Sequence, residues 1–489
     1  MNDSAGCGEP AGRRGRGLRT AAALSTFLLV AGCVPGAAPR PDSGAPRKAA
    51  SAPADDGAGS SGGRESGGLG DFLSDGGPDL ECLTPEEGES DLPGGDRDRG
   101  LGAQVQSISA RVEELRGLEF KEPVDAKLLS DAAIERRVGR LMSREYSDEL
   151  ADSEQRILSA LGAIPRATNL KRTRTQLLAG QVAGFYVPRT GELVVRSGAS
   201  EELPVIDRIT LAHELEHALA DQRLALPDDE APPPGEEDSH LAALSVVEGD
   251  ATLTMQRYAT TLSLGERLSL LADPALARGA TEGLDGVPHY LQQELTFPYL
   301  AGSRFVCSLY KKGGWRSVNH AYAKPPPTTA QVLFPERYGA GGRVKNPHDP
   351  GVPGPDWKPQ RRQSLGAANL LWLLEAPGGD AGRAIEDPLG AVEQWAGGEL
   401  ELWVRGRHTA VGIALEGRGA TGMLCDGVTE WYDAAWTQDG RIDTPRGSVF
   451  PASDSVQHAV VKCRPGEVRV GIAPNGDAAR RLARVAPGS

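Results

Sequence analysis

The spacing of apolar residues predicts that the middle of this 489-residue chain is mainly helical. Apolar side chains recur there at three- and four-residue steps, which places them on one face of an α-helix. The stretches with this period are residues 104–115, 131–161, 205–224, 239–264 and 289–312. An acidic, proline-rich break at 227–238 separates the third stretch from the fourth, and Gly313-Gly314 ends the fifth.

Shorter β-rich runs interrupt and follow the helical pattern. Residues 182–187 and 192–195 flank the turn sequence Pro188-Arg189-Thr190-Gly191, which predicts a β-hairpin directly before the third helix. Alternation of apolar and polar residues near the C-terminus predicts strands at 400–404, 408–414 and 456–463. Helices and strands in separate parts of the chain indicate the α+β class.

Runs rich in proline and glycine indicate where the chain divides. Pro325-Pro326-Pro327 and the stretch 339–359 predict a boundary after the helices. We therefore expect a mainly helical domain at 101–340, a linker at 341–360 and a small α+β C-terminal domain at 361–489.

The first hundred residues have the pattern of an export signal followed by a tether. Four arginines between residues 13 and 19 precede an apolar run at 21–31, which is too short for a transmembrane helix. The run ends in Val30-Ala31-Gly32-Cys33, which resembles a bacterial lipobox, so residues 1–33 are expected to be a lipoprotein signal peptide with Cys33 as the lipidated residue. The alternative is an ordinary cleaved signal peptide with a chance cysteine. Residues 34–100 are dominated by Gly, Ala, Pro, Ser and Asp, which predicts a disordered tether whose one candidate for local structure is residues 79–83.

This reading gives an exported protein that is lipid-anchored to the bacterial cell membrane or envelope and faces outward. Export places the cysteines in a compartment that permits disulfides. We expect Cys425 and Cys463 to pair, because both lie in the strand-rich C-terminal region. Cys82 and Cys307 either pair with each other or leave Cys307 as a free core thiol. The formal net charge of −14 argues against nucleic acid as a partner, because phosphate contacts need clustered Lys and Arg.

The predicted helix at 205–224 carries the sequence His213-Glu214-Leu215-Glu216-His217. Two histidines four residues apart lie about 40° and one turn apart on a helix, so both imidazoles can reach one metal ion. Glu214 lies beside that ion on the side where a bound water would sit, whereas Glu216 points to the other side of the histidine pair and is the poorer base. Leu211, Leu215 and Leu219 fall on the opposite face. The alternative is a solvated helix with two ordinary histidines.

A catalytic zinc needs a third protein ligand and an open position for water. Glu248 interrupts an apolar run in the next predicted helix, where an unpaired carboxylate would be costly and metal ligation removes that cost. Gly249 would allow close packing against the histidine helix. Rival third ligands are His240, Glu236 and Glu237, and His240 is the more serious of them because the two acids lie in the polar break.

These residues resemble the gluzincin type of HExxH zinc metallopeptidase, here in an exported bacterial lipoprotein form. The resemblance covers roughly residues 181–250 and reaches Tyr338 more loosely, and the separation of His217 from Glu248 is longer than in the best-known gluzincins. It implies a zincin-like fold in which His213, His217 and Glu248 bind one Zn²⁺ per chain. Glu214 would be the general base in hydrolysis of a peptide or protein substrate.

The resemblance also implies supporting roles for other groups. Asp221 or Asp250 would orient a ligand imidazole, with solvated acids as the alternative reading. The hairpin strand at 182–187 would be the edge along which an extended peptide lies, with plain core structure as the alternative. An oxyanion donor is expected among Tyr258, His289, Tyr290, Tyr299 and His320. Two other functions stay open: a zinc-stabilised binding lipoprotein without turnover, and a zinc hydrolase of a non-peptide amide.

Overall fold

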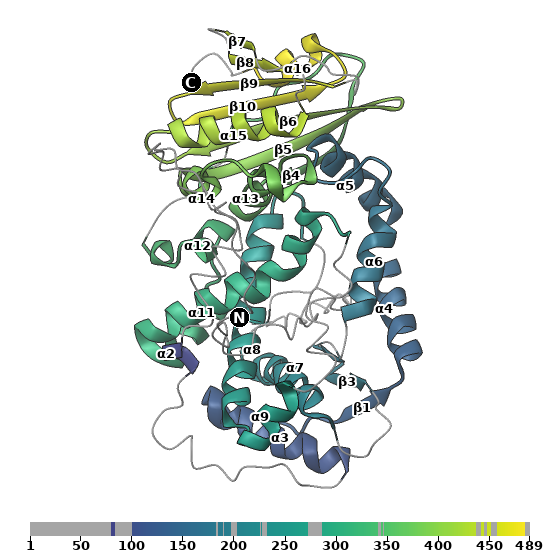
Figure 1. The fold of residues 1–489 in the computed structure, drawn as a ribbon, viewed down its shortest axis with the longest axis vertical. Coiled ribbons are helices and arrows are strands. Elements are labelled where there is room, and N and C mark those ends of the chain that lie inside the picture. The colour runs from purple at the N-terminus through teal and green to yellow at the C-terminus, as the bar shows by residue number, and fades with distance from the viewer. Residues whose placement is uncertain are drawn as a thin grey trace, which may run out of the picture.

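The structure is a computed structural model with an α+β fold, as the sequence predicts (Figure 1). It describes residues 80–83, 100–181, 184–188, 190–196, 203–224, 226, 232–271, 286–340, 344–345, 347–436, 442–444, 447–450 and 457–484. Cys33, the predicted signal peptide and most of the predicted tether lie outside these residues. No helix within the described ranges is long and apolar enough to cross a membrane.

Most helices precede residue 340, and they lie below the C-terminal sheet in Figure 1 except for α5, which lies beside it. They are α3 (Leu101–Arg116), α4 (Asp131–Glu145), α5 (Asp148–Ala160), α6 (Leu170–Gln181), α7 (Val205–Arg223), α8 (Glu237–Thr261), α9 (Leu264–Leu271), α11 (His289–Ala323) and α12 (Thr329–Leu333). The single helix expected at 131–161 is two helices. Ser147 separates them, because its side chain accepts a hydrogen bond from the Leu150 N–H and so caps the start of α5.

A three-stranded sheet lies beside α7. It consists of β1 (Ala126–Leu129), β2 (Gly184–Val187) and β3 (Glu192–Arg196) in the order β1-β3-β2. The expected hairpin is present, because β2 and β3 pair antiparallel, while β1 pairs parallel with β3. Strand β2 is therefore an edge strand, and it contacts α7 directly. Val182 and Ala183 of the predicted hairpin lie outside the described residues.

Helices α8 and α11 pack with their backbones in close approach. A Cβ atom on Gly249 would stand 2.3 Å from the Gly302 carbonyl group, and one on Gly302 would stand 2.3 Å from the Ser245 oxygen. The expectation that Gly249 packs against the histidine helix is therefore wrong, since its partner is α11. Helix α11 also continues past its expected end: Gly313 and Gly314 have non-helical dihedrals, and the chain resumes a helix after this kink.

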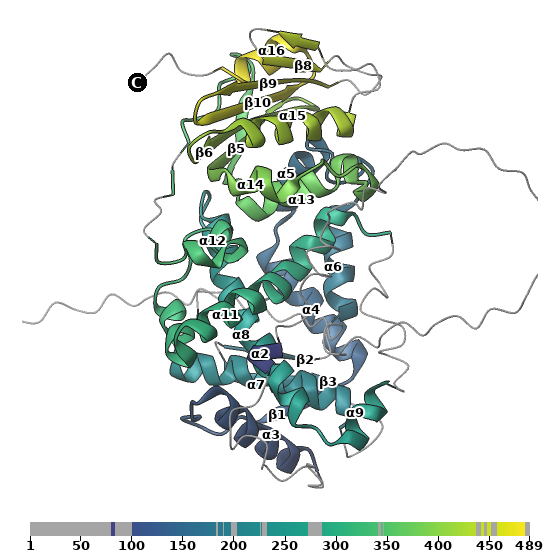
Figure 2. The same cartoon turned by 60° about the vertical axis from the view of Figure 1, so that its left-hand side comes forward.

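The C-terminal region is built on a seven-stranded sheet with the order β4-β5-β6-β10-β9-β8-β7. Its strands are β4 (Lys358–Ser364), β5 (Trp395–Arg405), β6 (His408–Gly417), β7 (Ile442–Thr444), β8 (Gly447–Phe450), β9 (His458–Arg464) and β10 (Glu467–Ala473). Its helices are α13 (Ala367–Glu375), α14 (Pro388–Glu393), α15 (Gly422–Trp436) and α16 (Gly476–Leu482). Strand β4 begins inside the segment expected to be a linker. Figure 2 shows α15 and α16 beside the central strands of this sheet, and both helices contact β9.

Two disulfides fix distant segments. Cys425 of α15 bonds to Cys463 of β9, which is the pair expected from the sequence. Cys82 bonds to Cys307, so the short helix α2 (Leu80–Leu83) is attached to α11. Helix α2 lies at the place within the expected tether where the sequence indicates local structure.

A candidate metal site between helices α7 and α8

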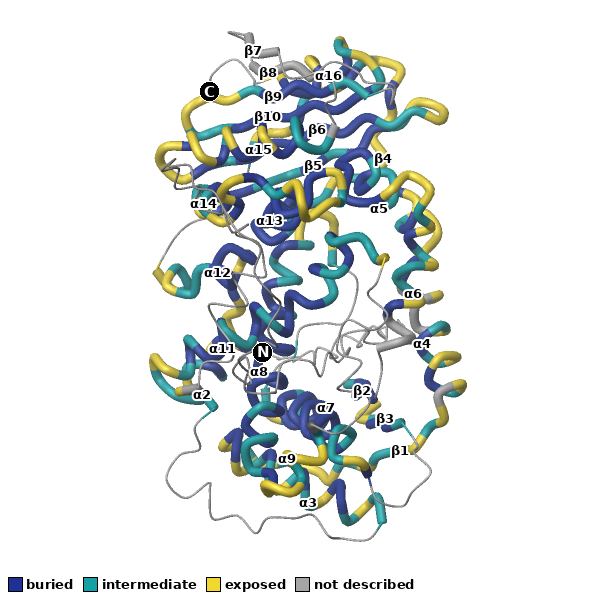
Figure 3. Tube along the Cα trace, in the orientation of Figure 1, coloured by how far each residue is buried: buried dark blue, intermediate teal, exposed yellow. Residues whose placement is uncertain are grey.

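Helix α7 is buried on the side of its polar residues as well as on the side of its leucines. Every residue from Arg208 to Ala220 is buried (Figure 3). The leucines at 211, 215 and 219 pack into a cluster with apolar residues of α3 and β3. Helix α8 contacts α7 as well. The histidines therefore lie inside the molecule, with exposed fractions of 0% for His213 and 4% for His217.

The two histidines and Glu248 of α8 form a compact triangle of donor atoms. His213 Nε2 lies 3.1 Å from His217 Nε2 and 3.2 Å from Glu248 Oε2, and His217 Nε2 lies 3.4 Å from the same oxygen. Ligands at 2.0–2.1 Å from a tetrahedral zinc ion stand about 3.3 Å apart. Within the described part of the chain, these three residues are the group that could hold a metal ion. His240, Glu236 and Glu237 are not part of it.

The environment keeps both imidazoles neutral, which is the form that binds a metal. Burial lowers the pKa of His213 and of His217 to about 4. Burial also raises the pKa of the Glu248 carboxyl, while hydrogen bonds and charge from His213 and a hydrogen bond from Tyr299 act in the opposite sense. A cation bound between the three donors would offset the cost of burying this carboxylate.

Glu214 connects helix α7 to the edge strand β2. Its Oε2 accepts a hydrogen bond from the backbone N–H of Tyr186 in β2 at 2.9 Å. Its Oε1 is buried and has no hydrogen-bond partner in the described part of the chain. Burial and the nearby Glu248 raise the pKa of the Glu214 carboxyl well above its usual value. The geometry thus fixes one oxygen of this carboxyl and leaves the other available to a bound water.

The two acids expected to orient an imidazole have other hydrogen-bond partners. Asp221 accepts from the Tyr186 hydroxyl at 2.7 Å. Asp250 accepts from Arg116 of α3 and from the Tyr322 hydroxyl. Asp250 still acts on the site through its charge, which favours protonation of His217 and so raises the pKa of that ring against the effect of burial.

Of the five expected oxyanion donors, Tyr299 is the one beside the ligands. Its ring stacks on the His213 ring with a centroid separation of 6.0 Å, and its hydroxyl donates to the Glu248 carboxylate. It lies one helical turn before Gly302, so the close approach of α8 and α11 brings it to the site. The other four have different surroundings. Tyr290 bonds Asn369, His289 pairs with Glu375, Tyr258 packs in the core beside α7, and His320 lines a separate pocket.

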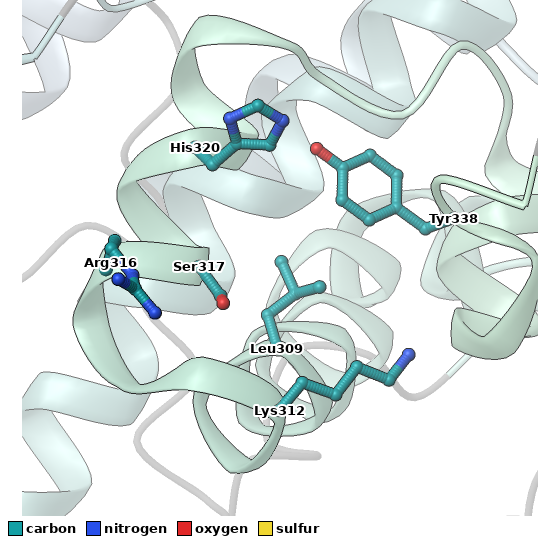
Figure 4. A pocket seen from close by; sticks show the side chains of 6 residues that line it. All are labelled: Leu309, Lys312, Arg316, Ser317, His320 and Tyr338. Carbon is teal, nitrogen blue, oxygen red and sulfur yellow. The ribbon is translucent and has the colours of Figure 1, made fainter.

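That pocket has a volume of about 380 Å³ and lies along the second half of α11 (Figure 4). It is lined by Leu309, Lys312, Arg316, Ser317, His320 and Tyr338, none of which is a metal-ligand candidate. Two of its polar groups are already bonded within the protein: the Lys312 ammonium donates to the Pro335 carbonyl, and the Tyr338 hydroxyl donates to the Lys324 carbonyl. The lining of this pocket therefore includes none of the residues of the candidate metal site.

No family model, curated protein or solved structure matches this chain. The roles of its residues therefore follow from its own geometry. Sequence reasoning missed Arg116 and Tyr186 as neighbours of the site. Arg116 ends an ordinary amphipathic helix and Tyr186 contributes a backbone N–H, so the sequence carries no signal that distinguishes either residue.

Proposed function

We propose that this protein is a zinc-dependent peptidase with a zincin-like catalytic region. The observation that carries the proposal is the triangle of His213 Nε2, His217 Nε2 and Glu248 Oε2, which has sides of 3.1, 3.2 and 3.4 Å. Glu214 is next to this triangle. When bound, zinc supplies a Lewis acid and lowers the pKa of a coordinated water towards about 7.

The chain's own residues then have distinct tasks. His213, His217 and Glu248 hold the metal. The Tyr186 N–H fixes Glu214 Oε2, and Glu214 Oε1 accepts a proton from the attacking water and passes it to the leaving amine. The Tyr299 hydroxyl orients Glu248, and its single O–H would turn from that carboxylate to stabilise the developing oxyanion.

A peptide substrate is supported by the position of β2. This strand ends the small sheet and contacts α7, and its residue Tyr186 touches the proposed base. Edge strands bind extended peptides by backbone pairing. We further propose that the enzyme is exported and attached to the bacterial envelope through a lipid on Cys33, where its substrate would be a peptide or protein.

One observation favours a second function, a zinc-stabilised lipoprotein without turnover. Glu214 and Glu248 are fully buried, as is typical of structural sites that are closed to substrate. Structural zinc sites, however, have four protein ligands, whereas the group in the described residues has three. The count of ligands leads us to prefer the peptidase.

Peptide cleavage by the wild-type protein and by one variant distinguishes the two functions. We expect the purified wild-type protein to cleave members of a broad peptide library, and Glu214→Gln to lose this cleavage while it retains zinc. Because general acid–base catalysis contributes about 10²- to 10⁴-fold, the loss should be of that size. Zinc in the wild type without cleavage of any peptide would favour the binding lipoprotein. A Glu214→Gln variant with full activity would contradict the proposed mechanism.

A further inference from the structure

A buried cationic network lies directly behind the candidate metal site. Arg116 of α3 is fully buried, and its Nε and Nη2 donate to the two carboxylate oxygens of Asp250 at 2.9 and 2.8 Å. Its Nη2 also donates to Asn319 Oδ1 at 2.6 Å, and its guanidinium lies 4.3 Å from the centre of the Trp315 ring. One side chain therefore joins α3, α8 and α11.

Glu216 lies between this network and a ligand histidine. Its Oε1 is 3.8 Å from Arg116 Nε, and its Oε2 is 3.8 Å from Nδ1 of His217. Nδ1 of His217 has no hydrogen-bond partner within the described ranges. Both side chains are buried, so no bulk water competes for that nitrogen.

Asp250 is not the carboxylate beside Nδ1 of His217. Its two carboxylate oxygens accept from Arg116 and from the Tyr322 hydroxyl, which lies 3.0 Å from Oδ2. Asp250 thus anchors the guanidinium. The guanidinium in turn offers a fixed positive charge beside the Glu216 carboxyl, which also has the Asp250 carboxylate as a neighbour.

Metal-ligating histidines usually donate their second ring N–H to a carboxylate, which fixes the tautomer and the ring orientation. We propose that Glu216 is the positioning residue for His217, and that the Arg116–Asp250 pair holds Glu216 in that place. The inference rests on the metal site of the proposed function and extends it, since it makes metal affinity depend on a residue of α3 that touches no ligand. Contraction of the 3.8 Å separation by about 1 Å completes the hydrogen bond.

The test measures metal affinity and metal geometry. Metal-free protein is titrated with Zn²⁺ against a chromophoric chelator, and the visible spectrum of the Co²⁺-loaded protein reports ligand geometry. We expect Glu216→Ala to bind Zn²⁺ about 10- to 100-fold more weakly and to change the Co²⁺ spectrum. Glu216→Gln keeps an acceptor oxygen of the same reach and should restore most of the affinity. Arg116→Lys loses the two-pronged contact with Asp250 and should also weaken zinc binding.

Arg174 provides the matched control. It is a half-buried arginine with a two-pronged contact, since its Nη2 donates to both carboxylate oxygens of Glu294 at 2.8 Å. Arg174→Lys should lower the Tm and leave the Zn²⁺ affinity unchanged, which separates positioning from general stability. Should Arg116→Lys fail to fold, the two Glu216 variants decide the matter.

The outcomes are distinct. Unchanged Zn²⁺ affinity and an unchanged Co²⁺ spectrum in Glu216→Ala would overturn the positioning role while leaving the proposed function intact. A folded wild-type protein that binds no Zn²⁺ would instead remove the proposed function. Equal loss of affinity in Arg174→Lys and Arg116→Lys would show that the effect is only structural.

Discussion

The interior around α7 and α8 and the interior of the C-terminal sheet both consist of buried residues. They differ in the chemistry of the side chains that they enclose. The first encloses His213, Glu214, Glu216, Glu248 and Asp250, all fully buried. The second encloses mainly apolar side chains, among them residues 411, 413, 468, 470 and 472 of β6 and β10. Among the described residues of this sheet, the fully buried cation is Arg469, which donates to two backbone carbonyls and to a neighbouring glutamate.

This difference indicates which of the two interiors contains a candidate functional site. Apolar burial stabilises a fold by itself, whereas burial of several ionisable groups costs free energy unless each is paired or bound to a metal. A chain under selection for stability alone would fill α7 and α8 with apolar residues, as it fills the C-terminal sheet. The concentration of ionisable groups on these two helices therefore indicates a site, and the contrast yields four predictions.

The largest expected effect is that of the metal on stability. Zinc at a thousand times its Kd should raise the free energy of unfolding of metal-free protein by about 4 kcal/mol, because it binds the folded triangle and not the unfolded chain. Glu248→Ala should abolish this gain. Thermal unfolding with and without zinc measures both, and an equal zinc response in the variant would contradict the assignment of Glu248.

Truncation in the sheet should affect stability alone. Leu402 of β5 is fully buried, so Leu402→Ala should lower the free energy of unfolding by about 3 kcal/mol. The zinc affinity of the folded protein should not change, because the residue belongs to the apolar interior. Denaturant unfolding measures the change in stability, and a chelator competition measures the zinc affinity. A weaker zinc affinity would show that the two interiors are coupled.

A methyl group at the α8–α11 contact should affect both properties. Gly249→Ala places Cβ 2.3 Å from the Gly302 backbone and should cost about 2 kcal/mol by forcing the helices apart. It should also weaken zinc binding, since Glu248 is the adjacent residue. Gly265→Ala is the control, because that helical glycine of α9 has nothing within 4 Å of the added Cβ and should be neutral or slightly stabilising. Equal effects of the two substitutions would contradict the close packing.

The smallest expected effect is a pH dependence at the contact between the two regions. Asp238 of α8 accepts from Thr329, its N–H donates to Ser364 of β4, and burial raises the pKa of its carboxyl to about 6. The folded state then binds more protons than the unfolded state between about pH 4 and 6, so stability falls as pH rises through that window. We expect an effect on the order of 1 kcal/mol, absent in Asp238→Asn. Identical pH profiles for the two proteins would contradict it.

The sequence predicted the elements of this fold better than their surroundings. The period of the apolar residues located α7, α8 and the β2–β3 hairpin, and alternation located β5, β6 and β9. Helical phase brought His213 and His217 together, and an acid in an apolar run identified Glu248. These are local properties of the chain, which a sequence records directly.

Contacts between distant elements could not be predicted from these local patterns. The sequence misplaced the partner of Gly249. It offered Asp221 or Asp250 as the group that orients an imidazole, whereas Asp221 accepts a hydrogen bond from the Tyr186 hydroxyl. It also missed the role of Arg116, which depends on residues 134 and 203 positions away. Local patterns do not say which helices meet. The burial of the polar side of α7 was unpredicted for the same reason.

The most direct test of the metal site is the anomalous scattering of a zinc-loaded crystal at the zinc edge. The account predicts one zinc ion per chain within about 2.1 Å of His213 Nε2, His217 Nε2 and a Glu248 carboxylate oxygen, with a fourth position not taken by protein. A zinc-loaded crystal with no peak at this triangle, or with zinc held by other residues, would contradict it.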